Sequence, residues 1–163
     1  MSLNARERAE RVEKYAAGAA RLRDAIASVP AEARQFRPAA GKWSAHEIVV
    51  HCADSETNAA VRVRYLLAEK EPRILGYDQE TWARSFDYHS HPLDAALATV
   101  EAVRANTAAL LRRLPEDAWS REGYHTESGR YTMDDWLRIY SDHVHNHSDQ
   151  IDRAHEAWKK SRV

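Results

Sequence analysis

The sequence predicts an all-α protein, an antiparallel four-helix bundle with long irregular connections. Its 163 residues include only 5 glycines and 5 prolines, the residues that most often interrupt regular structure. Between them, apolar residues recur at spacings of three and four, which is the period of a helix that buries one face. Four long segments carry this pattern, and four amphipathic helices can bury their apolar faces in one common core.

The first helix is expected over residues 4–29, where Pro30 ends it. Ser44 opens the second helix, because Glu47 follows it at the three-residue spacing of a capping box. One face of the second helix mixes apolar and polar side chains. The predicted inward-facing residues of these two helices are Val12, Tyr15, Ala19, Leu22, Ile26 and Val29, followed by Ile48, His51, Ser55, Asn58, Arg62 and Tyr65.

Residues 71–91 lack a clean period and are expected to form a long connection with one short helix. Pro92 suits the first turn of a third helix, which Pro115 ends. Residues 116–131 are expected to be a second irregular crossover, and Thr132 with Asp135 caps a fourth helix that reaches Trp158. The inward-facing residues are Leu93, Leu97, Val100, Arg104, Thr107, Leu111 and Leu114, then Trp136, Tyr140, His143, His147, Gln150, Ala154 and Trp158.

Composition excludes several classes of function. A chain of this length is expected to form a single domain over residues 1–163. Because 24 Lys and Arg balance 25 Asp and Glu, no strong field favours nucleic acid or an anionic membrane surface. The single cysteine, Cys52, excludes an internal disulfide and fits a reducing compartment. With no apolar run of membrane-spanning length and a polar N-terminus, we expect a soluble, cytoplasmic protein.

The segment "HVHNH" at residues 143–147 places three histidines within five positions. At about 100° per residue, His143 and His147 lie one turn apart on one face, whereas His145 is rotated by about 200° from His143. The first two lie on the predicted inner stripe of the fourth helix, where an unpaired polar ring is costly. We therefore expect His143 and His147 to share a partner in the bundle interior, and His145 to point elsewhere.

His51 lies on the inner stripe of the second helix and is the obvious third member of this group. Three neutral imidazoles with an open position are a common catalytic arrangement for zinc, and imidazole also suits nickel, iron and copper. This donor set excludes a hard-cation site such as that of calcium. The other histidines fall off these stripes or in connections: His46, His89, His91, His125 and His155.

A plainer interpretation stands beside the metal site, namely that the three histidines are hydrogen-bonded core residues. Glu47 and Asp54 lie about one turn from His51, and each is more simply explained as a capping or solvated carboxylate than as a group that orients a ligand. Cys52 points about 100° away from His51 and is expected to pack as a small buried residue.

Three stretches of the chain resemble the DinB-like superfamily, and within it the YfiT group. They are "GKWSAHEIVVHCADSETNAAVRVRYLLAE", "YDQETWA" and "GRYTMDDWLRIYSDHVHNHSDQI", which together span residues 36–153. The Trp-Ser opening, the histidine of "VVHCADS" and the His-x-x-x-His pair occur in the order that the family shows. The group includes proteins assigned as metal-dependent hydrolases and some that are bacillithiol S-transferases.

The resemblance implies an antiparallel four-helix bundle whose divalent metal is held by His51, His143 and His147. Zinc and nickel are the metals assigned to members of the family, and homodimers are frequent among them. Members include enzymes that join a low-molecular-weight thiol to an electrophile or isomerise a substrate through a thiol adduct. His145 is an addition to the motif, and the sequence identifies neither the thiol nor the acceptor.

Three functions follow as hypotheses: a metal-dependent thiol transferase, a metal-dependent hydrolase, and a non-catalytic metal-containing stress-response dimer. In either enzyme, the metal lowers the pKa of a bound thiol or water. Asp54, Asn58 and Arg62 match the group's pattern and are candidate helpers, Arg62 through a bidentate contact with a carboxylate. A helix-surface charge network explains these three equally well. For Tyr77, Asp78 and Trp82 in the long connection, packing against the bundle is favoured over lining a pocket.

Overall fold

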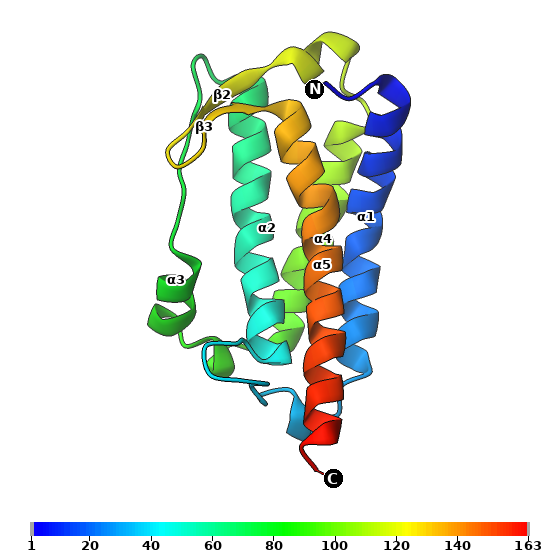
Figure 1. The fold of residues 1–163 in the computed structure, drawn as a ribbon. Helices are drawn as coiled ribbons and strands as arrows, with labels where there is room; N and C mark the ends of the chain where they lie inside the picture. Colours follow the sequence, from blue (N-terminus) through cyan, green and yellow to red (C-terminus); the bar gives the residue numbers. More distant parts are fainter. Residues whose placement is uncertain (1, 163) are drawn as a thin grey trace.

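The computed structural model describes residues 2–162 and confirms the four-helix bundle (Figure 1). Each predicted helix is present, with ends shifted by one to four residues where the terminal turns give way to caps. The long helices are α1 (Ala5–Ala27), α2 (Ala45–Ala68), α4 (Leu93–Leu111) and α5 (Met133–Lys160).

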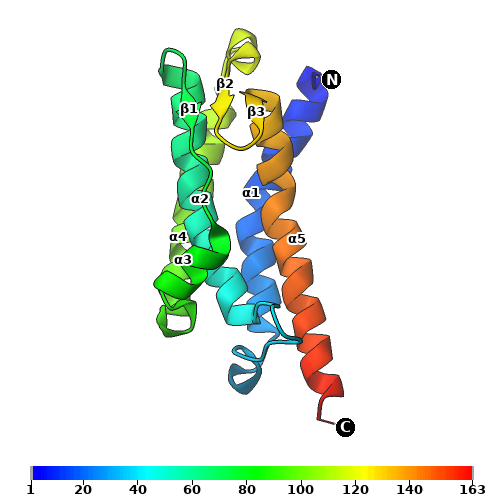
Figure 2. The same ribbon diagram turned by 60° about the vertical axis from the view of Figure 1, so that its left-hand side comes forward.

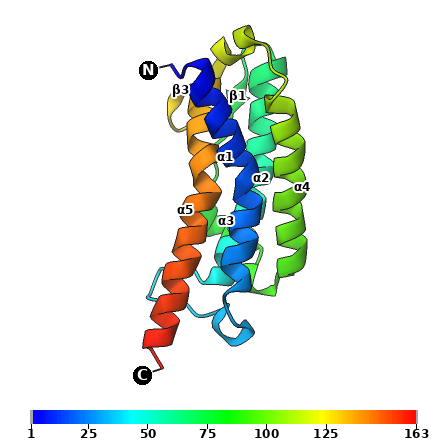
Figure 3. The ribbon, with the colours of Figure 1, turned by 90° about the vertical axis from the view of Figure 1, so that its right-hand side faces the viewer.

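The helices form two pairs that run in opposite directions. α1 packs mainly against α5 and α4, and α2 packs mainly against α4 and α5, so the consecutive helices α1 and α2 lie diagonally. In Figures 1 and 3, α1 and α5 descend while α2 and α4 ascend. This arrangement requires the connection of residues 69–92 to return along the whole length of α2 before α4 begins. α2 and α5, which carry the candidate site, are antiparallel neighbours.

Capping boxes begin three helices: α1, at Asn4 and Glu7, and the two helices that carry the histidines, α2 and α5. The Ser44 hydroxyl accepts a hydrogen bond from the Glu47 N–H, and the Glu47 carboxylate accepts one from the Ser44 N–H at 2.9 Å. Thr132 and Asp135 make the same reciprocal pair at α5. Both boxes were predicted from the sequence. Each one satisfies backbone N–H groups that have no partner inside the helix, which sets the register of the helices that carry the histidines.

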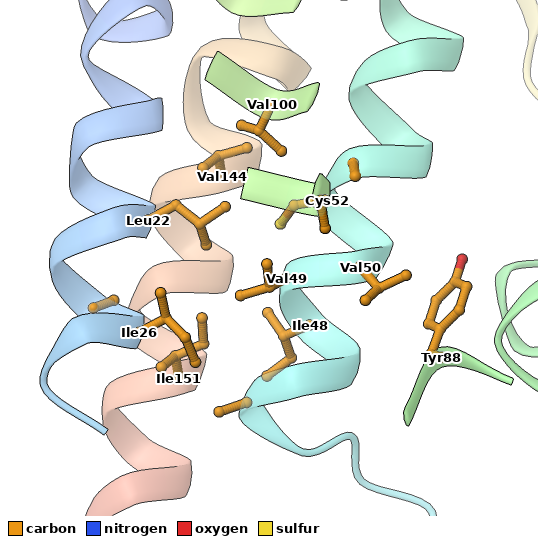
Figure 4. Close-up of a cluster of buried hydrophobic side chains, with 14 of the residues drawn as sticks. Leu22, Ile26, Ile48, Val49, Val50, Cys52, Tyr88, Val100, Val144 and Ile151 are labelled. Carbon is orange, nitrogen blue, oxygen red and sulfur yellow. The ribbon is translucent and has the colours of Figure 1, made fainter. Parts of the chain in front are cut away.

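The core follows the predicted stripes. Figure 4 shows Leu22 and Ile26 of α1 meeting Ile151 of α5 and Ile48 of α2 in one cluster of buried side chains. A second cluster contains Tyr15, Trp136 and Tyr140, among others. One residue of the predicted stripes is wrong, because Tyr65 is 46% exposed whereas the adjacent Leu66 is fully buried in its place.

The connections are more ordered than the sequence indicates. The expected short helix is present as α3 (Gln79–Ser85), and single turns of 3-10 helix occur at Ala31–Ala33, Tyr88–Ser90 and Glu116–Ser120. The prediction that residues 116–131 form an irregular crossover is wrong. They contain a hairpin of β2 (Glu122–His125) and β3 (Gly129–Thr132), and β1 (Arg73–Ile74) pairs parallel to β2. Strands of two to four residues are too short to display a period of two.

Arg104 of α4 ties all four long helices together at the centre of the bundle. Its side chain is fully buried and donates to the Glu56 carboxylate of α2 at 2.7 Å and to the Tyr140 carbonyl of α5 at 2.9 Å. It also donates to the Tyr15 carbonyl of α1, and its guanidinium lies 4.2 Å from the centre of the Tyr15 ring. The Tyr15 hydroxyl donates to Glu56 in turn, at 3.0 Å.

Gly18 makes room for this network. A Cβ atom at this position of α1 would lie 2.2 Å from a terminal nitrogen of Arg104, which its buried hydrogen bonds hold in place. Glycine normally costs helix stability, by about 1 kcal/mol relative to alanine. Here the absence of a side chain lets α1 approach the guanidinium.

Among residues 2–162, no helix is both long enough and apolar enough to cross a membrane.

We predict that Arg104→Ala destabilises the fold by ~3–5 kcal/mol, because it leaves the Glu56 carboxylate buried without its partner. Arg112→Ala is the matched control, since Arg112 caps the same helix and pairs with Glu13 at the surface. Urea unfolding followed by circular dichroism measures both. Equal midpoints for the two variants would show that the buried pair does not hold the helices together.

Candidate metal centre

Three histidines meet in the space between α2 and α5. His51 of α2 and His143 and His147 of α5 each offer one ring nitrogen, and the three nitrogens lie within 4.8 Å of one another. The ring centres are 4.6 Å apart for His143 and His147, 4.7 Å for His51 and His147, and 5.4 Å for His51 and His143. The structure thus brings together the three residues that the sequence singled out.

The facing atoms are the Nε2 nitrogens. His51 Nε2 and His143 Nε2 lie 3.4 Å apart, which is long for an N–H···N hydrogen bond. At a zinc–nitrogen bond of about 2.1 Å, two corners of a tetrahedron are separated by about 3.4 Å. The observed spacing along this edge therefore fits two imidazoles that bind one divalent ion.

The outer nitrogens show how the rings are oriented. His147 Nδ1 lies 3.0 Å from Gln150 Oε1, an acceptor only, so Nδ1 carries the proton and Nε2 keeps its lone pair. His143 Nδ1 is buried without a hydrogen bond and lies 3.9 Å from Glu56 Oε1. His51 Nδ1 is also buried without a partner among the described residues. Hydrogen bonds within the protein thus leave much of this group unsatisfied, which argues against purely structural core histidines.

Burial keeps all three imidazoles neutral. Loss of solvent, together with the neighbouring His147, lowers the pKa of His51 to about 3. The same loss of solvent lowers the pKa of His143 well below its usual value and lowers that of His147, which its bond to Gln150 partly opposes. Neutral imidazole is the form that binds a metal, so no proton has to leave these rings before an ion enters.

Polar and aromatic side chains surround the three rings. Trp43, just before α2, packs its ring 4.7 Å from that of His51. Ser55, one turn after His51, places its hydroxyl oxygen 3.5 Å from His143 Nε2. Tyr140, one turn before His143, has its ring centre 5.9 Å away. Aromatic rings thus flank His51 and His143, and a hydroxyl lies beside the donor atoms.

The predicted helpers lie on one face of α2, where Asp54 and Arg62 bind other segments and Asn58 bonds within the helix. Asp54 accepts a hydrogen bond from the Tyr88 hydroxyl at 2.5 Å, and the Asn58 amide donates to the Asp54 carbonyl at 2.9 Å. Arg62 donates to the Tyr140 hydroxyl at 2.8 Å and to the Leu75 carbonyl at 2.5 Å. Their contact with a substrate stays a prediction.

The remaining candidates lie away from the three rings, as expected. His145 faces α1, where its Nε2 lies 2.9 Å from the Lys14 carbonyl, and His46 Nε2 lies 2.8 Å from the His91 carbonyl. Glu47 is the capping carboxylate described above and also binds Arg37. Cys52 is fully buried, and burial raises the pKa of its thiol, which makes it a packing residue.

Sequence reasoning assigned no role to Glu56, Ser55 or Gln150, although all three adjoin the histidines. The signal for Glu56 was Arg104, an arginine on an otherwise apolar stripe, which requires an acidic partner from a facing helix. Gln150 lies three residues after His147 and so within reach on the same face. Ser55 was on the predicted inner stripe, and only the packing of α5 shows what it faces.

The histidine geometry agrees with comparisons to known proteins. The family model of the DinB superfamily matches residues 14–151. A protein of Oceanobacillus iheyensis named "Putative metal-dependent hydrolase" is 33% identical over 66% of this chain and 62% of its own length. YfiT of Bacillus subtilis, which carries the same description, is 31% identical over 66% of this chain and 61% of its own. The aligned region thus spans about three fifths of these relatives.

Solved structures extend the similarity. The structure of YfiT from Bacillus subtilis, described as a probable metal-dependent hydrolase with an unusual four-helix bundle topology, matches with a TM-score of 0.88. The match has 25% identity and covers 94% of this chain and 88% of that one. A mycothiol-dependent maleylpyruvate isomerase shares the fold, with a TM-score of 0.71 at 16% identity over 88% of this chain and 60% of that one. The bundle, its helix order and the match over residues 14–151 establish that the chain belongs to the DinB superfamily.

Proposed function

We propose that the chain binds one divalent ion, zinc or nickel, through His51, His143 and His147, and activates a low-molecular-weight thiol for attack on an electrophile. The observation that carries this proposal is the convergence of three neutral imidazoles whose ring nitrogens lie within 4.8 Å. A divalent ion held by three uncharged donors keeps its full charge and lowers the pKa of a thiol or water beside it.

An exogenous ligand has room at this site. Within residues 2–162, no fourth His, Cys, Asp or Glu joins the three histidines, and the His143 side chain is 17% exposed. Structural zinc sites are closed by four protein ligands, whereas catalytic sites keep a position for water or substrate. This difference favours an enzyme over a binding dimer whose metal only stabilises the bundle.

A pocket beside the histidines suits the acidic groups of a small thiol. It has a volume of about 290 Å³ and lies between Trp43, which contacts His51, and Gln150, which binds His147. Lys42 and Arg153 line the same pocket and supply two positive charges. A carboxylate placed there is attracted by both cations while its thiol extends toward the rings.

Hydrolysis is the second candidate, because the relatives named above are described as metal-dependent hydrolases. Hydrolysis by a metalloenzyme commonly uses a carboxylate that takes a proton from the attacking water. The carboxylate beside His143, that of Glu56, is bound by Arg104 and Tyr15, and it faces Nδ1 and not the donor atom. A thiol activated by the ion requires no such base, which favours thiol transfer.

The proposal also includes a homodimeric state and a cytoplasmic location. A homodimer follows from the family resemblance, and no step of the mechanism depends on a second chain. The buried thiol of Cys52 suits a cytoplasmic location and plays no part in the transfer, because the cosubstrate supplies the sulfur.

We predict near-stoichiometric zinc or nickel in the wild-type protein purified without a metal-affinity step, and its loss in His147→Ala. His145→Ala is the matched control, since it removes the same ring from the same helix two residues away, on the face toward Lys14. Elemental mass spectrometry of the three proteins is the measurement. Metal lost from His145→Ala but retained by His147→Ala would place the ion on the face of α5 that is directed toward Lys14.

Metal binding is also expected to stabilise the fold. At a free ion concentration of 100 times Kd, linkage adds ~2.7 kcal/mol to the free energy of unfolding. For a chain of this length, that corresponds to a rise in Tm of about 5–10 °C. Differential scanning calorimetry of metal-free and reloaded protein measures it, with His51→Ala as the variant in which the rise should vanish. A similar rise in that variant would place the ion elsewhere.

Thiol dependence separates transfer from hydrolysis. We expect the zinc- or nickel-loaded protein to join bacillithiol, cysteine or coenzyme A to an epoxide or an alkyl halide, and His143→Ala to lose this activity. Thioether products are measured by liquid chromatography and mass spectrometry. Turnover of ester or amide substrates without any thiol, together with no thioether formation, would favour the hydrolase.

A further inference from the structure

Tyr77 lies on the short segment between β1 and α3, which runs along α2 in Figure 2. Both sides of the segment are anchored. The Gly76 N–H donates to the Thr126 hydroxyl at 2.9 Å, and Asp78 caps α3 by accepting from the Thr81 N–H at 3.0 Å. Arg62 holds the Leu75 carbonyl. Tyr77 therefore sits at a fixed position, not on a free loop.

The aromatic ring of Tyr77 is packed, as the sequence suggested, but its hydroxyl is not satisfied. The ring lies 4.4 Å from that of Trp82, and the Arg62 guanidinium is 5.8 Å from its centre. The hydroxyl oxygen is buried and makes no hydrogen bond of normal geometry among the described residues; Ser55, which lies near it, contributes only a weak interaction. Packing alone would be served by phenylalanine, and a buried hydroxyl without a partner disfavours folding. The hydroxyl therefore calls for an explanation that packing does not supply.

Shared neighbours connect Tyr77 to the metal centre. Arg62, whose guanidinium lies over the Tyr77 ring, donates to the Tyr140 hydroxyl at 2.8 Å, and the Tyr140 ring lies 5.9 Å from that of His143. Ser55 and Tyr140, the side chains that influence the pKa of Tyr77 together with Arg62 and Asp54, are the same ones that adjoin His143. Burial raises the pKa of Tyr77 to about 12, and the nearby Ser55 hydroxyl partly opposes this shift. The group therefore keeps its proton at neutral pH and is available as a hydrogen-bond donor.

We propose that the Tyr77 hydroxyl is a catalytic donor to the electrophile, and that the electrophile is one whose oxygen gains negative charge during attack, such as an epoxide or an α,β-unsaturated carbonyl. This inference rests on the proposed thiol transfer. Ser55 adjoins His143 Nε2 and also influences the Tyr77 hydroxyl, so the phenol belongs to the surroundings of the metal centre without being one of its ligands. In the proposed complex the thiol occupies the pocket beside Trp43, and the phenol contacts the second reactant.

The reaction balances without a further reagent. The sulfur forms a bond to an electrophilic carbon. In an epoxide, the electron pair of the broken C–O bond stays on the oxygen; in an α,β-unsaturated carbonyl, the C=C pair shifts toward the carbonyl carbon and the C=O π pair moves onto the oxygen. Tyr77 donates a hydrogen bond to that oxygen as charge develops, and the oxygen or the adjacent carbon finally takes up the proton that the thiol lost. A donor aimed at developing charge is worth about 100- to 1000-fold in rate.

The kinetic test compares Tyr77→Phe with wild type on two acceptors and one thiol. With 1,2-epoxybutane, where charge develops on oxygen, we expect kcat to fall about 100-fold. With 1-bromobutane, where bromide leaves, we expect a change below about 3-fold, because no oxygen needs a donor. Tyr65→Phe, an exposed tyrosine of α2, should match wild type on both. Metal content should be the same in all three proteins.

A second measurement does not depend on activity. The Tyr77→Phe variant should unfold at the same urea concentration as wild type or at a higher one, because it removes a hydroxyl that has no well-formed hydrogen bond in the protein. Tyr88→Phe is the contrasting variant, because the Tyr88 hydroxyl donates to Asp54 and its loss should lower the midpoint.

Three outcomes would overturn the assignment of Tyr77. Equal losses on both acceptors, or no loss on either, would leave it a packing residue, and so would a lowered midpoint like that of Tyr88→Phe. Absence of thiol transfer in the wild-type protein is a different failure, which removes the proposed function and the role of Tyr77 together.

Discussion

The ion pair of Arg104 and Glu56 is the interaction on which the geometry of the bundle depends. An arginine cannot lose its charge inside a protein, so Arg104 has to find a carboxylate and carbonyl groups at the centre of the fold. It obtains them from α2, α5 and α1, and thereby fixes how far each of these helices is translated along its neighbour. Glu56 also lies 3.9 Å from His143 Nδ1, so the same ion pair packs directly against the histidine site.

The histidine site shows how burial prepares side chains for a ligand. Removing the three rings from water opposes their protonation, and it leaves His51 Nδ1 and His143 Nδ1 without partners. Both effects cost folding free energy, since buried polar atoms lose their bonds to water. A bound ion would satisfy the facing Nε2 nitrogens and leave the two Nδ1 atoms as they are.

The topology decides which segments reach the site. α2 and α4 run in the same direction, so the chain has to return to the other end of the bundle after α2 and before α4. Residues 69–92 make this return along the outside of α2 (Figure 2). A two-residue strand fastens this return to the hairpin before α5. The long connection is therefore the part of the chain that delivers Tyr77 to the face shared by α2 and α5. A bundle with short loops between antiparallel neighbours would have no such segment.

The sequence by itself determined the four helices, two of the capping boxes and the three histidines, because helical period and cap spacing are local properties that can be read along one chain. It also placed His145 correctly off the face. The tertiary structure alone decided the diagonal order of the helices and the pairing of β1 with β2. It likewise revealed the contact of Glu56 with Arg104 and the burial of the Tyr77 hydroxyl. These features join residues that are tens of positions apart, and their partners are fixed by packing and desolvation across helices and not by spacing within one of them.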